Sequence, residues 1–383
     1  MEEVRIAVQG RPRPVSFCPV RVTVDRSSSE LESCELVDVA ADRAVAFQME
    51  PAAGGTTIHW MVDSIAPDQR KEYVLREGPG LSQTPQVRVE PGDDGPVTVR
   101  IGGELLTRYL YGESVPKPCL YPLIGPFGLG VTRAYPQEER EGDSTDHVHH
   151  RSLYVAWGDV NGSDNWGEEQ GAGRMEHRYF EAADSGPIFG RLVALNDWLD
   201  GGGNRLMQDR LEYRFYRTPP SFRLLDMEVT LYASEGEVRF GDTKEGGICS
   251  VRVATPLEVN HTGRIENGYG GVNEGETWGK RAPWCDYSGV LEGDRVGIAA
   301  FDHPSNLRHP TYWHVRNYGL MTANPFGLSF FVDKNADGSY TLPAGGRLRF
   351  RYRLYVHAGD ARQGRVGDKY LDWIFPPSVE VQQ

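Results

Sequence analysis

The residues best suited to chemistry are three histidines within four positions, in the segment DHVHHRSLYVAW at 146–157. If this segment begins a β-strand, His147 and His149 point to one face, because side chains alternate along a strand. Two imidazoles about 6.5–7 Å apart can chelate one divalent metal ion. A third ligand would come from elsewhere in the chain, from His303, His314 or Glu245. The alternatives are acid–base catalysis, substrate binding and ordinary packing.

The polar loop GDVNGSDNWGEEQGAG follows directly, at 158–173. A loop of turn-forming residues and carboxylates after a strand is a common place for binding groups. Trp166 offers an apolar ring face on which a sugar can stack, whereas Trp157 is expected in the core. We expect His150 and Arg151, just upstream, to bind substrate.

A second dense segment, FDHPSNLRHPTYWHVRNYGLMTANPFG at 301–327, combines histidines, arginines, asparagines and aromatic residues. If YWHVRNYG is extended, His314, Arg316 and Tyr318 share one face, opposite Trp313 and Val315. Such a face suits the floor of a ligand cleft. Asp302 and His303 precede a proline and are candidate catalytic groups, and the expected amide ligands for substrate are Asn306 and Asn324.

Two further segments supply single candidates. Glu245 lies before Gly246–Gly247 and an apolar strand, where a carboxylate can act as a general base. Arg133, in the glycine- and proline-rich segment 121–143, is a candidate substrate ligand. The Gly-x-x-Gly-x-Gly order in that segment lacks a surrounding βαβ unit, so we expect no nucleotide cofactor.

The elements around these residues read as β-strands. Alternating segments such as VTVRIGG, RLEYRFYR and RLRFRYRLYVHAG recur between turns that draw on 45 glycines and 25 prolines. This pattern predicts an all-β protein of stacked sheets. A Gly- and Pro-rich stretch near 80–92 indicates a boundary between an accessory β-domain at 1–88 and a larger domain at 89–383 that carries the site. A short helix is expected within 363–374.

Composition excludes several classes of partner. The net charge of -13 argues against nucleic acid. No run of about 18 apolar residues is present, so no membrane span is expected. The five cysteines are far apart without a CxxC motif, which favours reduced, buried thiols. With no signal peptide visible, a cytoplasmic location is favoured, although a trimmed secreted form would look the same. Homo-oligomerisation is left open.

The chain resembles a known family through a series of motifs in order: YPLIGPFG, DHVHHRSLYVAWGDVNGSDNW, GDTKEGG, WGKRAPWCDYSG, DHPSNLRHPTYWHVRNYGLMTANPFG and YRLYVHAGD. Across about residues 95–375 these resemble the PmoA-like family of bacterial proteins. The resemblance implies carbohydrate metabolism and a galactose-mutarotase-like stacked β-sandwich, or supersandwich, with a cleft lined by His, Arg, Asp, Glu and Trp. The likeness to mutarotases themselves is architectural, so their chemistry does not transfer with the fold.

The sequence thus predicts a carbohydrate-active enzyme that cleaves a glycoside or an oxidised (keto) sugar by His/carboxylate acid–base chemistry. The chemical centre would be His149, His303 and His314, with Glu245 and Asp302 as bases. One divalent metal ion on His147 and His149 would assist the reaction. The alternatives are a sugar mutarotase or epimerase and a non-catalytic carbohydrate-binding protein.

Overall fold

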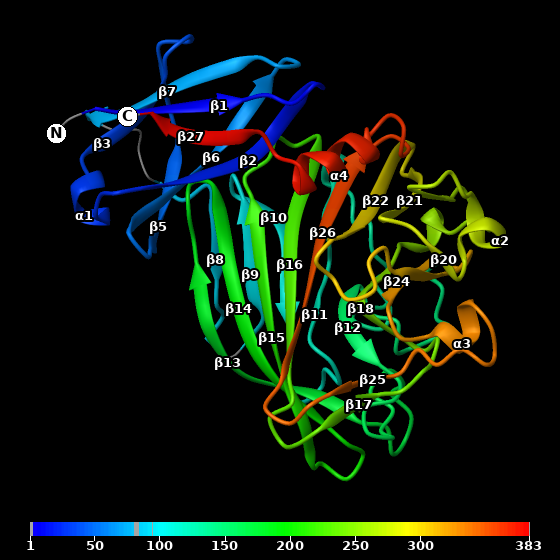
Figure 1. The fold of residues 1–383 in the computed structure, drawn as a ribbon. Helices are drawn as coiled ribbons and strands as arrows, with labels where there is room; N and C mark the ends of the chain where they lie inside the picture. Colours follow the sequence, from blue (N-terminus) through cyan, green and yellow to red (C-terminus); the bar gives the residue numbers. More distant parts are fainter. Residues whose placement is uncertain (1–2, 80–83, 94, 383) are drawn as a thin grey trace.

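The computed structural model describes residues 3–79, 84–93 and 95–382 and consists mainly of antiparallel β-sheets (Figure 1). The strands form where apolar and polar residues alternate. In β15 (Arg205–Tyr216), Leu211 and Tyr213 are buried, whereas their neighbours Arg210 and Glu212 are half-buried on the other face. That period of two matches the pleat of a strand. The predicted all-β, stacked-sandwich class is confirmed.

Two large sheets form the main sandwich. In spatial order, the eight-stranded sheet contains β13 (Arg174–Asp184), β14 (Phe189–Leu199), β15, β16 (Phe222–Tyr232), β26 (Arg347–Ala358), β22 (Asp294–Asp302), β21 (Trp284–Leu291) and β19 (Arg264–Asn267). The nine-stranded sheet contains β20 (Lys280–Arg281), β23 (Tyr312–Val315), β24 (Leu320–Asn324), β18 (Gly246–Arg252), β12 (Leu153–Trp157), β11 (Cys119–Leu120), β10 (Glu104–Leu110), β9 (Val97–Ile101) and β8 (Val87–Glu90). One continuous apolar core joins them, and Trp157 lies in it, as predicted.

A smaller β-unit at the N-terminus has a core of its own around Trp60. Its five-stranded sheet runs β27 (Ser378–Gln382), β1 (Val4–Gln9), β7 (Arg70–Glu77), β3 (Cys34–Asp38) and β4 (Arg43–Val45). Its three-stranded sheet runs β2 (Val15–Val24), β6 (Gly55–Ile65) and β5 (Phe47–Ala52). The C-terminal strand β27 therefore completes the N-terminal unit, where it lies beside β1 (Figure 1).

The predicted division at residues 88 and 89 falls inside β8, which already pairs with β9 in the larger sheet. The boundary region around 80–92 includes residues 80–83, which lie outside the described residues. The connection between the two units therefore ends before Val87.

The remaining elements are short. The helices are α1 (Ser28–Leu31), α2 (Asn273–Thr277), α3 (Leu328–Phe331) and α4 (Val366–Ile374), with a two-stranded sheet of β17 (Val238–Phe240) and β25 (Tyr340–Leu342). The helix expected within 363–374 is confirmed as α4. All five cysteines are buried. In the described part of the chain, no helix has the length and apolar character needed to cross a membrane.

Strand pairing around β18 brings the candidate segments together. β18 lies between β12 and β24, and β24 pairs in turn with β23, so that His314 is opposite Thr322. Gly247 permits the close approach of β18 and β24, because a Cβ there would lie 1.4 Å from Thr322 Oγ1. The loops before β12 and β18 and the turn after β23 consequently meet in one place.

Candidate functional site

A cavity of about 490 Å³ opens where these segments meet. Its walls come from four parts of the chain: the loop before β12, the polar loop after it, the segment before β18 and the end of β23 with its turn. The lining includes His147, His149, His150, Asp164, Trp166, Glu169, Lys244, Glu245, His314, Arg316 and Tyr318. The structure therefore gathers eight of the predicted site residues into one cavity.

The histidine segment itself is a turn, so the prediction that it begins a strand is wrong. His147 has a left-handed backbone (φ 43°), and β12 begins only at Leu153. The cause is Arg133, whose fully buried guanidinium donates hydrogen bonds to the backbone carbonyls of Asp146, His147 and His150. These carbonyls point inward to the guanidinium instead of to a neighbouring strand. Arg133, predicted to bind substrate, instead shapes the loop.

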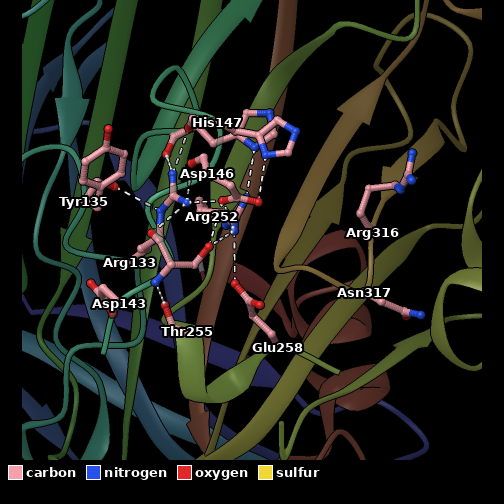
Figure 2. Close-up of polar contacts among 12 residues, drawn as sticks. Arg133, Tyr135, Asp143, Asp146, His147, Arg252, Thr255, Glu258, Arg316 and Asn317 are labelled. Carbon is pink, nitrogen blue, oxygen red and sulfur yellow. Dashed lines mark hydrogen bonds and ion pairs between the residues drawn. The ribbon is translucent and has the colours of Figure 1, made fainter. Parts of the chain in front are cut away.

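An ionised carboxylate orients His147 (Figure 2). Asp146 Oδ1 accepts hydrogen bonds from Arg133 at 2.6 Å and Arg252 at 2.7 Å, and Asp146 Oδ2 lies 2.8 Å from His147 Nδ1. Burial raises the pKa of Asp146, but Arg252 and the hydrogen bonds from His147 and Ser144 outweigh it and lower the pKa to about 2. The carboxylate holds a proton on Nδ1, so Nε2 is the ring nitrogen that remains to carry a proton or to contact a ligand.

The ring of His147 lies within a group of stacked rings. It is nearly parallel to His150 at 4.6 Å and to Tyr318 at 4.9 Å between centroids. The guanidinium groups of Arg252 and Arg316 lie over the ring of Tyr318, 5.1 and 5.3 Å from its centre, in cation–π contacts. Because these contacts restrain both plane and position, the imidazole is preorganised before any ligand binds.

His314 differs from His147 because a neutral backbone carbonyl, not a carboxylate, lies at its Nδ1. Its Nδ1 donates to the backbone carbonyl of Lys244 at 2.7 Å, and Nε2 is buried without a hydrogen-bond partner among the described residues. Burial lowers its pKa to about 4, although Glu245 and the bond to Lys244 oppose this. The ring is therefore neutral near pH 7, with a free lone pair on Nε2. Such a group can take a proton or accept a hydrogen bond.

Glu245 lies beside His314, directly before β18. Its carboxylate forms an ion pair with Lys244. Burial raises the pKa of Glu245, but the hydrogen bond and charge of Lys244, together with His314, bring it below its usual value. Asn324 fixes this segment by donating to the carbonyls of Thr243, Lys244 and Gly246. Asn324, predicted to bind substrate, is fully buried and instead positions the segment that carries Glu245.

His149, His150 and Trp166 complete the wall behind these groups. Burial lowers the pKa of His149 and lowers that of His150 further, with His149 and Arg252 adding to the effect on His150. His150 Nδ1 accepts a hydrogen bond from Arg252 at 3.2 Å. Trp166 was expected as an exposed stacking ring but is only 2% exposed, and its Nε1 has no partner among the described residues.

Three predicted residues lie elsewhere. Asp302 is fully buried and binds His309, Thr311 and Asn306. Asn306 also bonds the backbone of Arg351. His303 accepts from Ser305 at Nδ1 and lines a different cavity, between the N-terminal unit and the eight-stranded sheet. These residues brace the loop after β22 and are not part of the histidine cavity.

Arg151 also has a supporting place. It forms a two-point ion pair with Glu168 at 2.8 and 2.7 Å, and buried Lys117 reaches the same carboxylate at 3.3 Å. With its side chain only 8% exposed, Arg151 anchors the polar loop that carries Trp166.

Metal binding has no ready ligand set in this geometry. Among residues 3–79, 84–93 and 95–382, no group of three or more His, Cys, Asp or Glu side chains is arranged to hold a metal ion. His147 and His149 rings are nearly perpendicular, 5.8 Å apart, and His147 Nδ1 is engaged by Asp146. Metal binding at this pair stays a prediction, and the chemistry below uses only the side chains of the chain.

Sequence reasoning missed Asp146, Arg252 and Lys244. Arg252 is the most informative: it is fully buried in β18, where it contacts Asp146 and Glu258 (Figure 2). It also donates a hydrogen bond to His150. The signal was present as a single arginine inside the apolar strand GICSVRVA, since a buried guanidinium needs anionic partners. Asp146 could have been found from its place directly before His147.

The fold and cavity define an all-β sandwich protein with a histidine-rich site in its larger unit. Residues 96–370, which contain that site, match DUF6807, a family of unknown function, and the chain belongs to this family. No curated protein matches the chain.

Proposed function

We propose that the protein is a carbohydrate-active enzyme that cleaves an oxidised (keto) glycoside by acid–base chemistry in the histidine cavity. The observation that supports this most is the pairing of two unlike imidazoles in one cavity. His314 is neutral with a free Nε2, and His147 is backed by the ionised Asp146. A base and an acid with different electrostatic settings are what a proton-transfer enzyme needs.

A carbohydrate suits the lining of the cavity. Lys244, Glu245 and Arg316 offer charged groups for its hydroxyls. The volume of about 490 Å³ is in the range of small-ligand sites. Both points agree with the resemblance to the PmoA-like family.

In the proposed reaction, His314 Nε2 removes the hydrogen on the carbon next to the keto group. The C–H electron pair forms a C=C bond, and the bond from the adjacent carbon to the glycosidic oxygen breaks. That oxygen keeps the bonding pair and receives a proton from His147 Nε2, while Asp146 stabilises the imidazolium before the transfer. The products are an unsaturated keto sugar and an alcohol, so atoms and charges balance. Glu245 and Lys244 would hold the substrate hydroxyls.

Ordinary two-carboxylate glycoside hydrolysis is less well supported. Two of the three carboxylates in the cavity wall hold their own loop: Asp164 accepts from the backbone of Trp166 and Gly167, and Glu169 accepts from that of Glu168. Glu245 alone is left, whereas this chemistry normally needs an acid and a base or nucleophile. A mutarotase or epimerase is the second candidate, since the same two histidines could exchange protons without breaking a glycosidic bond.

The test is turnover of methyl glycosides and of the same glycosides oxidised to ring ketones, measured by the release of methanol. We expect turnover of a keto-glycoside, a loss of 100-fold or more in kcat for His314→Ala and His147→Ala, and no change for the exposed loop variant His261→Ala. Anomer exchange on free sugars without cleavage would favour the mutarotase. Sugar binding that persists in both variants, with no turnover of any substrate, would favour the binding protein.

A further inference from the structure

A second cavity, of about 690 Å³, lies at one end of the main sandwich. It forms where the turn between β9 and β10 meets the loop at 124–128 and the turn between β15 and β16 (Figure 1 shows these strands). None of its lining residues belongs to the proposed catalytic site.

The main polar feature of this cavity is Arg223, at the start of β16. Its side chain is more than nine-tenths buried, with 8% of the residue exposed. Its Nη1 donates to the carbonyls of Pro219 and Phe222 at 2.9 and 3.0 Å, but its buried Nε has no hydrogen-bond partner among the described residues. In the same described part of the chain, no carboxylate forms an ion pair with it. The charge of Glu104 acts on Arg223 without forming an ion pair. A buried cation that lacks an ion pair is costly, which points to a missing partner.

The charges and walls of the cavity indicate what that partner is. Arg217 and Arg223 are opposed by one carboxylate, that of Glu104, which leaves one net positive charge in the lining. Leu105, Ile124 and Phe127 supply apolar surface. The lining therefore suits a monoanion attached to an apolar body.

Phe127 supports this reading. It is 60% exposed and adopts a left-handed backbone (φ 61°), a conformation that is strained for an aromatic residue. Strained residues at a cavity mouth are commonly kept for binding, and an exposed ring there gains apolar contact when a ligand enters.

We infer that this cavity is a binding site for a small monocarboxylate with an apolar body, with Arg223 holding the carboxylate and Phe127 covering the apolar part. The site is separate from the proposed catalytic cavity, and the inference does not depend on the proposed function.

Isothermal titration calorimetry of the whole chain with phenylacetate tests it. We expect phenylacetate to bind with a Kd below about 1 mM and the uncharged phenylacetamide to bind about tenfold more weakly or not at all, because it lacks the charge. Phenyl phosphate, whose second charge the lining does not balance, should also bind more weakly. Equal binding of the amide, tighter binding of the phosphate or no binding of phenylacetate would overturn the inference.

Variants locate the binding. Arg223→Gln should weaken phenylacetate binding about tenfold or more, and the exposed-ring variant Phe127→Ala, which leaves the core untouched, should weaken it several-fold. Arg239→Gln is the matched control, because Arg239 is exposed on β17, beyond the far end of β16 from Arg223. Unchanged binding in Phe127→Ala, or in a folded Arg223→Gln, would place the ligand elsewhere and contradict the inference.

Discussion

Removing Arg252 should destabilise the protein strongly, because this residue is the only cation that contacts Glu258 within the described contacts and is fully buried. Its Nη2 lies 2.7 Å from Asp146 Oδ1 and 3.0 Å from Glu258 Oε1. Arg252→Gln leaves Glu258, which is 5% exposed, without its cation. Breaking one side of a buried ion pair costs about 3–5 kcal/mol. Asp146 keeps Arg133 and is partly exposed, so we expect the lower end, about 3 kcal/mol.

The design is a double-mutant cycle, measured by guanidinium chloride unfolding at pH 7. Arg252→Gln/Glu258→Gln should recover about 1–2 kcal/mol of the loss, because the unpaired buried carboxylate is then gone. A loss below about 1 kcal/mol, or a double variant no more stable than the single one, would refute the reasoning.

The pH dependence gives an internal check on the same variant. Burial already raises the pKa of Glu258 in the native protein, against the opposing charge of Arg252. Without Arg252 the folded state should bind a proton there more tightly than the unfolded state does. The deficit of Arg252→Gln should therefore narrow as the pH falls from 7 toward 5.

Three further predictions concern the site and its support. Asp146→Asn should lower kcat of the cleavage reaction by about 100-fold with little change in KM, because His147 loses the carboxylate that orients it; an unchanged kcat would contradict this. The pKa of His314 is lowered to about 4, so the reaction rate should fall only as the pH falls through about 4, where His314 becomes protonated and can no longer act as the base. A fall in rate near pH 6.5 that is abolished in His314→Gln would contradict the assignment. Gly247→Ala should destabilise the protein by about 1–3 kcal/mol or more, measured by thermal unfolding, because the added Cβ would lie 1.4 Å from Thr322 Oγ1. An unchanged melting temperature would show that β18 and β24 can separate freely.

The class of fold could be predicted from the sequence because a strand that is buried on one face shows its period directly. β15 is such a strand, as its alternating burial shows. β18 gives no such period, since all seven of its residues are buried, and its place between β12 and β24 had to come from the structure. The pairing of β27 with β1 likewise joins distant parts of the chain and leaves no local signal.

The candidate site could be predicted in its residue types but not in its geometry. His314, Arg316 and Tyr318 do line one cavity, although only His314 lies within β23. The separation of His303 from His314 could not be read from a segment that contains both, because the chain turns between them. The turn at His147 depends on Arg133, whose hydrogen bonds span 13 to 17 positions of the chain. A local pattern does not contain contacts of that range.

The pairing of β27 with β1 has a consequence for how the chain folds. β27 follows every other described strand, so β1 exposes an unpaired edge until the whole sandwich has been synthesised. Such an edge can pair with another chain, and a contact between such distant segments forms slowly. The small unit therefore cannot finish folding ahead of the large one on the ribosome, and β1 stays open to pairing with another chain during that interval.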